Sequence, residues 1–361
     1  MKAQHSRYSE AVTRSDVFPG DGACDVAIIG AGPIGIELAI ALKHAGVRFA
    51  LIDAGNVGST FLWWAPGTRF FSSPERIAVA GVRLVTANQD KATREEYLAY
   101  LRGVVQQFDV TVTSGVRITR IERRGEMYQL ASDGRAALRA SRIVLAIGNM
   151  HKPRLLGVPG EDRPHVSHYL RDPHEYFGRR VLIVGGKNSA VEAAIRLHRV
   201  GARVAISYRG EAFDPKRVKY WLRPELEWLI QKRRIEFLPR TEVESIDDVG
   251  VRLRSSGSSG SSVQPVDDVL LLTGYVQDSA LFEQCGVTLE GDERTPSHDA
   301  KSMRTNAPGI SVAGTAVGGS QRRARLFIEN THVHVQRIVR DIAGVDVPWK
   351  VEADYAALEE A

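Results

Sequence analysis

Three glycines near the N-terminus have the spacing of a turn that binds a diphosphate. Gly30, Gly32 and Gly35 form a complete G-x-G-x-x-G after an apolar run at residues 26–29. The first glycine permits a tight turn, the second lets a pyrophosphate approach the backbone, and the third lets the following helix pack against the strand. The N–H groups at the start of that helix would face the phosphates. Asp53 ends the next apolar run, where an acid can bond the ribose hydroxyls, so the segment predicts a dinucleotide site.

The same segment occurs a second time in the chain. Residues 181–208 repeat residues 26–53 without a gap, and Gly185 matches Gly30 at an offset of 155 residues. Lys187 replaces the central glycine, where it would place a positive charge beside the cofactor phosphates, and alanine is tolerated at the last position. The predicted contacts of this second site are Gly185, Gly186, Lys187, Asn188, Ser189, Ala190, Tyr208 and Arg209.

The end of the repeat indicates which nucleotide the second site prefers. Tyr208 matches Asp53, so no carboxylate is present there to favour a free 2′-hydroxyl. Arg209 follows it and offers a planar fork of N–H donors that suits a 2′-phosphate. This favours NADPH over NADH; the alternative is that Arg209 is an ordinary surface arginine.

Both repeats have the pattern of strand, glycine turn, helix and strand, which is a βαβ unit. Continuous apolar strands that alternate with helices indicate parallel sheets covered on both faces. We therefore predict an α/β protein with two Rossmann-like, three-layer dinucleotide-binding domains. Apolar strands at 142–148 and 268–274 each follow a predicted β-meander, at 110–131 and 235–253. The Ser/Gly-rich segment 254–263 is expected to be a flexible hairpin loop rather than a domain linker.

Composition narrows the class of protein. The chain has a formal net charge of +5 and a pI of about 9.2, but no basic stripe alternates with aromatic residues, so nucleic acid is not an expected partner. No apolar stretch approaches the ~20 residues that cross a bilayer, and the first 22 residues lack a signal-peptide core. Two cysteines and no C-x-x-C fit a reducing compartment, so we expect a cytoplasmic protein that does not bind membranes.

Longer segments add a resemblance to a known family. The chain resembles the thioredoxin-reductase-like flavoproteins, and within them the bacillithiol-disulfide reductase group. The resembling segments are FFSSPERI (70–77), VPGEDRPHVSHYLRDPHEYFGRRVLIVGGKNSAVEAA (158–194), YRGEAF (208–213), VKYWLRPELE (218–227) and RLFIEN (325–330). Together they span most of the chain from about residue 25 to residue 345.

This resemblance implies which cofactor each glycine turn holds. FAD would bind at the first turn and NADPH at the second. The flavin site would be completed by strand 142–148 and by residues 310–315, where Thr315 stands in place of the family's usual acid, and a helix would follow from about residue 327 to residue 342. The implied FAD contacts are Gly30, Gly32, Pro33, Ile34, Gly35, Asp53, Ala146, Gly148, Gly314 and Thr315.

The domain organisation implied by the resemblance is discontinuous. Residues 1–155 and 276–361 would form the FAD-binding domain, and residues 156–275 an inserted NADPH-binding domain. A hinge between the two would lie near residues 153–160 and 274–280. A homodimer is expected by analogy only.

The implied reaction passes hydride from NADPH to FAD and then electrons to a disulfide or another acceptor, either a small molecule or a small redox protein. The resembling group has a cysteine straight after the proline of the first turn, where this chain has Ile34. Isoleucine cannot form a mixed disulfide, so the resemblance supports the NADPH-to-FAD half-reaction better than disulfide reduction. Cys24 and Cys285 are expected to be bystander thiols. No catalytic residue and no metal site are assigned.

Three alternatives to this function stay open at this stage. One is a ferredoxin/flavodoxin-type NADP reductase, which the basic surface and the missing cysteine fit. Another is a flavin-dependent monooxygenase, although the F-x-G-x-x-x-H signature is not matched at residues 158–169. The last is a non-catalytic nucleotide-binding regulator.

Two further groups of residues have more than one interpretation. The loop 56–73 carries the aromatic side chains of Trp63, Trp64, Phe70 and Phe71, among others, and either covers the flavin, with Arg69 or Thr60 near the ring, or packs between the domains. His332 and His334 could face the flavin or the core. No spacing marks His165, His168 and His174 as metal ligands.

Overall fold

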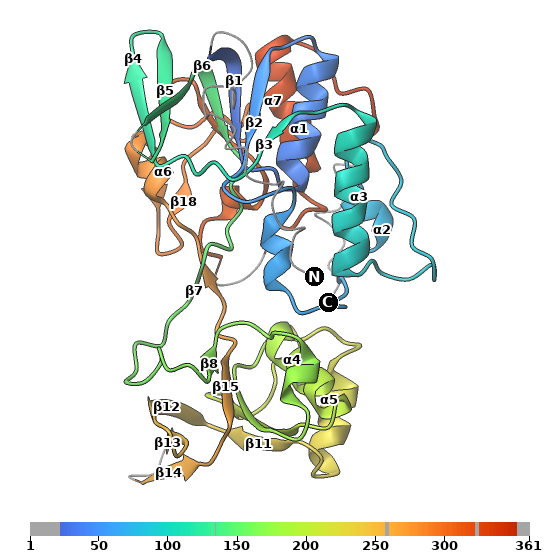
Figure 1. Ribbon diagram of the computed structural model, residues 1–361, viewed down its shortest axis with the longest axis vertical. Coiled ribbons are helices and arrows are strands. Elements are labelled where there is room, and N and C mark those ends of the chain that lie inside the picture. Colours follow the sequence, from blue (N-terminus) through green and yellow to red (C-terminus); the bar gives the residue numbers. More distant parts are fainter. Residues whose placement is uncertain (1–21, 134, 257–259, 322–324, 352–361) are drawn as a thin grey trace, which may run out of the picture.

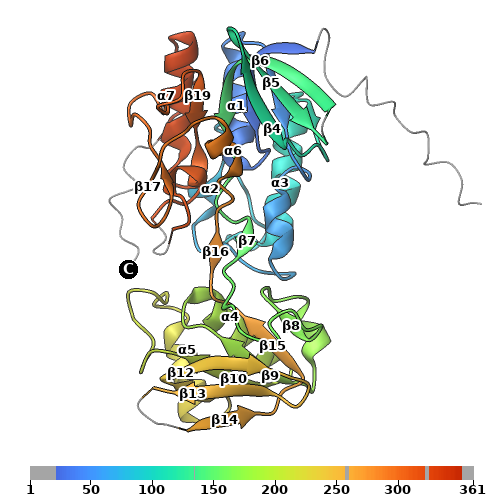
Figure 2. The same cartoon turned by 90° about the vertical axis from the view of Figure 1, so that its left-hand side faces the viewer.

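The computed structural model describes residues 22–133, 135–256, 260–321 and 325–351, which form two lobes (Figure 1). The first lobe holds a seven-stranded sheet and the second a five-stranded sheet. Between them run two short strands, β7 (Lys152–Pro153) and β16 (Tyr275–Val276), which pair antiparallel. Figure 2 shows this pair as the bridge between the lobes.

The first lobe is built on a mixed sheet in the order β3-β2-β1-β6-β5-β4, with β19 added beside β6. The parallel part of this sheet consists of β3, β2, β1, β6 and β19. β5 pairs antiparallel with β6, and β4 pairs antiparallel with β5. The strands are β1 (Ala23–Ile29), β2 (Phe49–Ile52), β3 (Val112–Thr113), β4 (Arg120–Arg124), β5 (Met127–Ser132), β6 (Arg135–Leu145) and β19 (Ile310–Val312). The apolar residues of β1 and β2 are buried in the core of this lobe.

Helices α1 (Pro33–His44) and α7 (His332–Ala343) lie side by side on this sheet (Figure 1). Every residue of α1 from Ile34 to Leu42 is buried, as expected for a helix enclosed between a sheet and another helix. Helix α3 (Arg94–Gln107) begins with a capping box in which Thr93 and Glu96 exchange hydrogen bonds. The shorter helices of this lobe are η2 (Ser59–Trp63), α2 (Pro74–Ile77), α6 (Ala280–Gln284) and η4 (Gly314–Gly318). A small hairpin pairs β17 (Leu289–Glu290) with β18 (Thr295–Pro296).

The second lobe contains an all-parallel sheet in the order β11-β10-β9-β15-β8. Its strands are β8 (Val166–Ser167), β9 (Arg180–Val184), β10 (Arg203–Tyr208), β11 (Glu236–Pro239) and β15 (Asp268–Leu271). One apolar core lies under η3 (Pro173–Tyr176), α4 (Asn188–Arg199) and α5 (Arg223–Gln231). A second core lies toward the antiparallel sheet of β12 (Thr241–Ile246), β13 (Val251–Ser255) and β14 (Ser261–Gln264). The parallel sheet is therefore covered on both faces.

Both repeats form the predicted βαβ unit, β1-α1-β2 in one lobe and β9-α4-β10 in the other, so the predicted fold class is confirmed. The hairpin expected at 254–263 is present between β13 and β14, with residues 257–259 outside the described part. The domain boundaries at residues 155 and 276 remain a prediction about folding units.

Two local predictions were wrong. The predicted meanders begin too early, because β3 and β11 are edge strands of the parallel sheets. The last helix begins at His332 rather than near Phe327, because side chains hold the preceding loop. The Asn330 side chain accepts a hydrogen bond from Phe327 N, and the Thr331 hydroxyl donates to the Phe327 carbonyl. Side-chain bonds of this kind compete with helical ones.

Candidate functional site

The first glycine turn has the close packing that its sequence predicts. Gly30 has a φ of +110°, and a Cβ there would lie 2.4 Å from the Ala146 carbonyl oxygen. A Cβ on Gly35 would lie 1.9 Å from the Gly30 carbonyl oxygen. A Cβ on Gly32, in contrast, would meet no atom within 4 Å. The outer two glycines are therefore required by the fold itself, whereas the space beside the middle one is open to a ligand.

The start of α1 completes an anion-binding arrangement next to that open space. Gly32 is the N-cap residue, Pro33 occupies the first turn, and no side chain caps the helix. The first turn also carries no acidic residue. The backbone N–H groups and the positive end of the helix dipole therefore remain available to phosphate oxygens.

Asp53 lies at the end of β2, beside the turn. One carboxylate oxygen accepts a hydrogen bond of 2.7 Å from Ala31 N, and the other accepts 2.7 Å from Gly55 N and 3.3 Å from the Ser59 hydroxyl. The structure thus brings the acid to the glycine turn, where it fixes the backbone of both adjoining loops. Its contact with a ribose remains a prediction.

Three further segments meet at the same edge of the sheet. Strands β6 and β19 lie side by side and end together, with Leu145 opposite Val312. Beyond these ends, Thr315 Oγ1 lies 3.8 Å from where a Cβ on Gly148 would be. The Ile34 side chain lies against Gly314, with its Cβ 3.4 Å from where a Cβ on that glycine would be. Ligands of such folds bind beyond the carboxyl ends of parallel strands, so these residues lie at the expected place.

His334 supports this edge from α7. Its Nδ1 accepts a hydrogen bond of 3.2 Å from the backbone N–H of Gly314. Burial, together with the positive charge of Arg337, lowers the pKa of His334 to about 3. The imidazole is therefore neutral at physiological pH and can accept this bond. The sequence left the orientation of this histidine open, and the structure turns it toward the glycine loop.

We expect His334 to make the protein acid-sensitive. Its folded pKa lies below the ordinary value of about 6.5, so the unfolded chain binds more protons and stability falls as pH falls from 6.5 toward 3. His334→Gln keeps a neutral acceptor for Gly314 N. Between pH 7 and pH 5, the free energy of unfolding of this variant should therefore fall by about 2 kcal/mol less than the free energy of unfolding of the wild type does. Urea denaturation at both pH values measures this. If the free energy of unfolding had the same pH dependence in both proteins, His334 would not be the source of the acid sensitivity.

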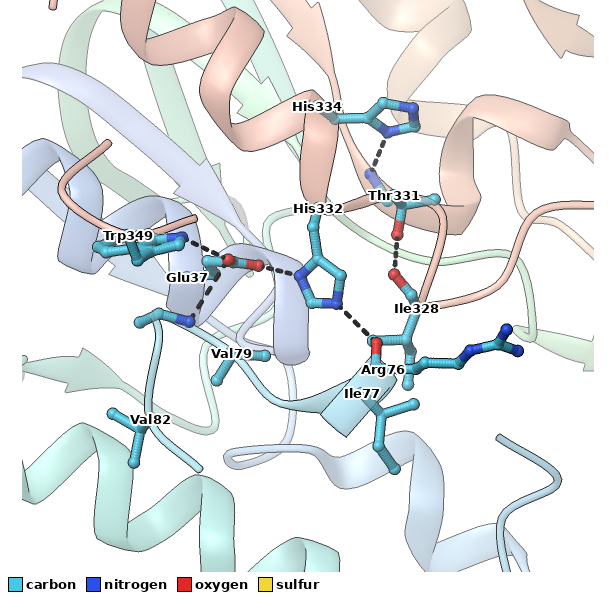
Figure 3. Close-up of polar contacts among 12 residues, drawn as sticks. Glu37, Arg76, Ile77, Val79, Val82, Ile328, Thr331, His332, His334 and Trp349 are labelled. Atoms are coloured by element: carbon cyan, nitrogen blue, oxygen red, sulfur yellow. Dashed lines mark hydrogen bonds and ion pairs between the residues drawn. The ribbon is translucent and has the colours of Figure 1, made fainter. Parts of the chain in front are cut away.

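A buried cluster next to this histidine joins α1 to α7 (Figure 3). A hydrogen bond joins His332 Nδ1 to Glu37 Oε2, and the other ring nitrogen faces the Arg76 carbonyl oxygen at 3.1 Å. Trp349 Nε1 donates to Glu37 Oε1 at 3.0 Å. Burial opposes the charging of His332, but the Glu37 carboxylate raises its pKa above the ordinary value. Both nitrogens can then donate, so this buried cluster ties α7 to α1.

The second glycine turn is packed differently. A Cβ on Gly185 would lie 2.6 Å from the Leu272 carbonyl oxygen, so this turn also meets the neighbouring strand. A Cβ on Gly186 would lie only 2.3 Å from the ring of Tyr208, which is stacked on Phe213 with ring centroids 5.7 Å apart. Tyr208 therefore packs on the turn itself, where the first copy has a carboxylate. Ala190 is buried behind Gly185, with its Cβ 3.1 Å from where a Cβ on that glycine would be.

Positive charges gather around this turn. Partial desolvation and the charges of Arg217, Arg154 and Arg209 lower the pKa of Lys187. Arg209 is exposed and forms no salt bridge with a carboxylate of the described residues. Helix α4 starts after Lys187 with no side-chain cap and no acidic residue in its first turn. The site therefore offers several cations and a helix N-terminus to a molecule with several phosphates.

The two remaining predicted contacts of this site have different surroundings. Asn188 Oδ1 accepts a hydrogen bond of 2.8 Å from Lys219 N, so its carbonyl end fixes the loop before α5. Ser189 is exposed on the first turn of α4. Lys219 lies in the segment that also supplies Arg217, so Asn188 positions part of the cationic set.

The loop at residues 56–73 packs both within the first lobe and across to the second. Phe61 and Phe70 are buried, with ring centroids 5.3 Å apart. Trp63 lies 5.6 Å from Tyr169 and Phe71 lies 6.0 Å from Trp221, in both cases between ring centroids and across the lobes. Packing between the lobes is thus present in the structure, and the covering of the flavin remains a prediction.

The two named polar residues of this loop have separate positions. Arg69 pairs with Asp90, with an N–O distance of 3.1 Å, and donates to the Lys91 carbonyl oxygen at 2.8 Å. Thr60 lies in η2. The amine of Lys91 lies 3.8 Å from the centroid of the Trp221 ring, a cation–π contact that again joins the lobes.

Arg196 of α4 makes the polar contact between the lobes. Its guanidinium donates to the Thr68 hydroxyl at 2.7 Å and to the Pro66 carbonyl oxygen. It also lies 3.8 Å from Glu192, whose pKa is raised by burial in spite of this neighbour. No local sequence pattern predicts this role, because the arginine and the loop are far apart in the chain.

We expect Arg196 to hold the loop in place. Arg196→Ala removes hydrogen bonds from a charged donor, each worth ~1.5–3 kcal/mol, so amide hydrogen exchange at residues 67–71 should become about tenfold faster through local opening. Arg199→Ala is the matched control, because Arg199 lies on the same helix and, among the residues that the structure describes, bonds only Glu225 of the second lobe. Exchange mass spectrometry would measure both. Equally fast exchange in the two variants would show that Arg196 does not specifically hold this loop.

The two thiols and the three histidines of the segment 165–174 are assigned no role. Burial raises the pKa of Cys24 to about 11 and that of Cys285 to about 12, so both stay protonated near neutral pH. His165, His168 and His174 lie around β8 and η3 in the second lobe. No three His, Cys, Asp or Glu side chains gather as a metal site within the described ranges. No helix of these ranges is long and apolar enough to cross a membrane.

Comparisons with known proteins agree with this geometry. The family model of the pyridine nucleotide-disulphide oxidoreductases matches residues 27–314. The chain is 33% identical over 316 residues to bacilliredoxin reductase Bdr of Bacillus subtilis, covering 88% of this chain and 96% of that protein. It is 26% identical over 303 residues to a ferredoxin–NADP reductase of Ignicoccus hospitalis, covering 82% of this chain and 92% of the relative.

Solved structures give the same result. The bacillithiol disulfide reductase Bdr of Bacillus cereus superposes with a TM-score of 0.84 at 33% identity, covering 89% of this chain and 99% of that one. A thioredoxin reductase of T. acidophilum superposes with a TM-score of 0.69 at 19% identity, covering 90% of this chain and 99% of that one, and shows the fold alone. The two glycine turns described above fall within the matched region.

Proposed function

We propose that the final electron acceptor of this protein is a disulfide. The premise is that the chain belongs to the pyridine nucleotide-disulphide oxidoreductase family and is an FAD-dependent NADPH oxidoreductase. The overall reaction would be NADPH + H⁺ + RSSR → NADP⁺ + 2 RSH. Each turnover moves two electrons to the disulfide, and the two sulfurs take up two protons, one that derives from the hydride and one from solution. The names of the Bdr relatives, a bacilliredoxin reductase and a bacillithiol disulfide reductase, support a disulfide of this class.

The observation that supports the transfer from NADPH to FAD is the pair of glycine turns in separate lobes. Each turn ends a parallel strand and opens a helix without a side-chain cap. Bound FAD supplies a centre that takes a hydride from NADPH and returns electrons to the acceptor. The chain's own part is to hold the two dinucleotides, orient them and exclude water between the lobes.

We assign the predicted contacts to these two tasks. The open space at Gly32 and the N-terminus of α1 would take the FAD diphosphate, and Asp53 a ribose. Lys187 and Arg209 would take NADPH phosphates. The remaining contacts follow the same division. For FAD they are Gly30, Pro33, Ile34, Gly35, Ala146, Gly148, Gly314 and Thr315; for NADPH they are Gly185, Gly186, Asn188, Ser189, Ala190 and Tyr208.

The protein thiols do not take part in this proposal. Ile34 stands at the first turn, and the pKa values of Cys24 and Cys285, raised to about 11 and 12, keep both thiols protonated near pH 7. The disulfide would therefore have to receive electrons from the reduced flavin directly. A second candidate acceptor is a small one-electron protein such as a ferredoxin. The missing cysteine favours it, and ferredoxin–NADP reductases are among the relatives.

Anaerobic stopped-flow mixing tests the function. NADPH should bleach the flavin absorbance much faster than NADH does. Bacillithiol disulfide or oxidised bacilliredoxin should then reoxidise the flavin, with two thiols released for each NADPH. Reoxidation by ferredoxin alone would move the assignment to the second candidate. A protein that takes up no FAD and consumes no NADPH would contradict both.

The remaining parts of the assignment concern organisation. We propose an FAD-binding domain of residues 1–155 and 276–361 and an inserted NADPH-binding domain of residues 156–275, a homodimer, and a cytoplasmic location. The two chain crossings at β7 and β16 support the division, because the strands between them form the sheets of the second lobe.

A further inference from the structure

Gln277 is a buried polar side chain at the junction between the bridge and the first lobe. It follows β16 directly, and only 6% of its surface is exposed. Its backbone N–H donates to the Ser320 hydroxyl at 2.9 Å. The chain thus enters the first lobe at a residue whose side chain points into the lobe rather than into solvent.

The amide nitrogen of Gln277 joins two segments that lie beyond the ends of β6 and β19, where the flavin is expected to bind. Nε2 donates to the Gly148 carbonyl oxygen at 3.0 Å and to the Ala316 carbonyl oxygen at 2.9 Å. Gly148 follows β6, and Ala316 lies in η4, next to Thr315. A glutamine amide nitrogen has two N–H donors, so both are used. This fixes which end of the amide is nitrogen and which is oxygen.

The oxygen of the same amide has no donor. Gln277 Oε1 is buried and receives no hydrogen bond from any described residue. A buried acceptor without a partner costs ~1–3 kcal/mol, and most such atoms in native proteins are partnered. The two bonds of Nε2 account only for the donor end of the amide, so the unpartnered oxygen, beside the segments where the flavin is expected, points to a ligand.

We propose that Gln277 is an FAD-binding residue whose Oε1 accepts a hydrogen bond from a donor group of the bound flavin. The inference rests on the proposed function only in its assignment of FAD to the first lobe. Apart from its adenosine part, whose ribose is assigned to Asp53, FAD offers two kinds of donor, the ribityl hydroxyls and the imide N–H of the ring. Either would satisfy the oxygen, and Nε2 would at the same time hold the Gly148 and Ala316 carbonyls in their positions around the cofactor.

Flavin analogues distinguish this contact from a purely structural role. Apoprotein is titrated with FAD, with FAD methylated at the ring imide, and with FAD analogues that each lack one ribityl hydroxyl. The wild type should bind one of these analogues about tenfold more weakly than FAD, which identifies the donor. Gln277→Met, of similar length but without an acceptor oxygen, should bind FAD about tenfold more weakly and should no longer distinguish that analogue from FAD.

Ser320→Ala is the matched control. It removes the hydroxyl that accepts from Gln277 N but leaves Oε1 in place, so its affinities for FAD and for all analogues should shift by one common factor. If Gln277→Met does not fold, Gln277→Asn draws the oxygen back by one methylene and replaces it. The proposal is overturned if the wild type binds every analogue as tightly as FAD, or if the Gln277 variant weakens all of them equally. These titrations need neither NADPH nor an acceptor, so a failed proposed function would be seen separately.

Discussion

Gly32→Ala should leave a folded apoprotein that binds FAD about 100-fold more weakly. The backbone at Gly32 has φ −75° and ψ −179°, which alanine adopts readily, and its Cβ would meet no protein atom within 4 Å. The new methyl group would instead occupy the open space in which the diphosphate must approach α1. Losing about one or two charge-assisted hydrogen bonds at ~1.5–3 kcal/mol each gives this factor. Fluorescence titration of the apoprotein with FAD measures it.

Gly35→Ala provides the contrasting variant. Its Cβ would lie 1.9 Å from the Gly30 carbonyl oxygen, so the turn itself cannot form and the apoprotein should lose at least about 3 kcal/mol of stability. Gly32→Ala should cost the apoprotein less than about 1 kcal/mol, because alanine is only a poorer N-cap than glycine. Normal FAD affinity in a folded Gly32→Ala protein would place the diphosphate elsewhere.

These two variants reflect what the sequence could predict. The internal repeat located both glycine turns, both helices and the acid at the end of β2, because such features depend on residues close together in the chain. Gly30, Gly35 and Gly185 each have a close backbone neighbour that requires glycine. Local spacing carries this information, so the architecture was predictable to within a few residues except at the edge strands and at the start of α7.

Contacts between distant segments could not be predicted in the same way. Arg196 meets residues 66 and 68, and Gln277 joins Gly148 to Ala316. Each of these polar groups acts through a partner more than 35 positions away, and no periodicity marks it. The pairing of His332 with Glu37 is of the same kind. Such contacts follow from the folded sheet order, which places β6 between β1 and β19.

Tyr208 is an intermediate case. The repeat showed that it replaces the acid of the first copy, and the prediction placed it at the cofactor. The structure shows its ring packed on Gly186 and stacked on Phe213. An aromatic ring there supports the turn, but it cannot recognise a 2′-phosphate by charge. Discrimination between NADPH and NADH must then come from cations near the turn.

Arg209→Ala should lower kcat/KM for NADPH by about 10- to 100-fold and leave kcat/KM for NADH within about threefold. Arg209 follows β10, is exposed and adds positive charge beside Lys187, and a hydrogen bond from arginine to phosphate contributes ~1.5–3 kcal/mol. Arg203→Ala is the matched control, because it removes an exposed arginine from the other end of the same strand and should change neither value. Steady-state kinetics with both nucleotides at two salt concentrations measures these changes. The preference of the wild type for NADPH over NADH should weaken at the higher salt concentration, because salt screens the charge of the phosphate. If the variant lost activity equally with both nucleotides, Arg209 would support the fold of the turn instead, and recognition of the 2′-phosphate would pass to Arg217.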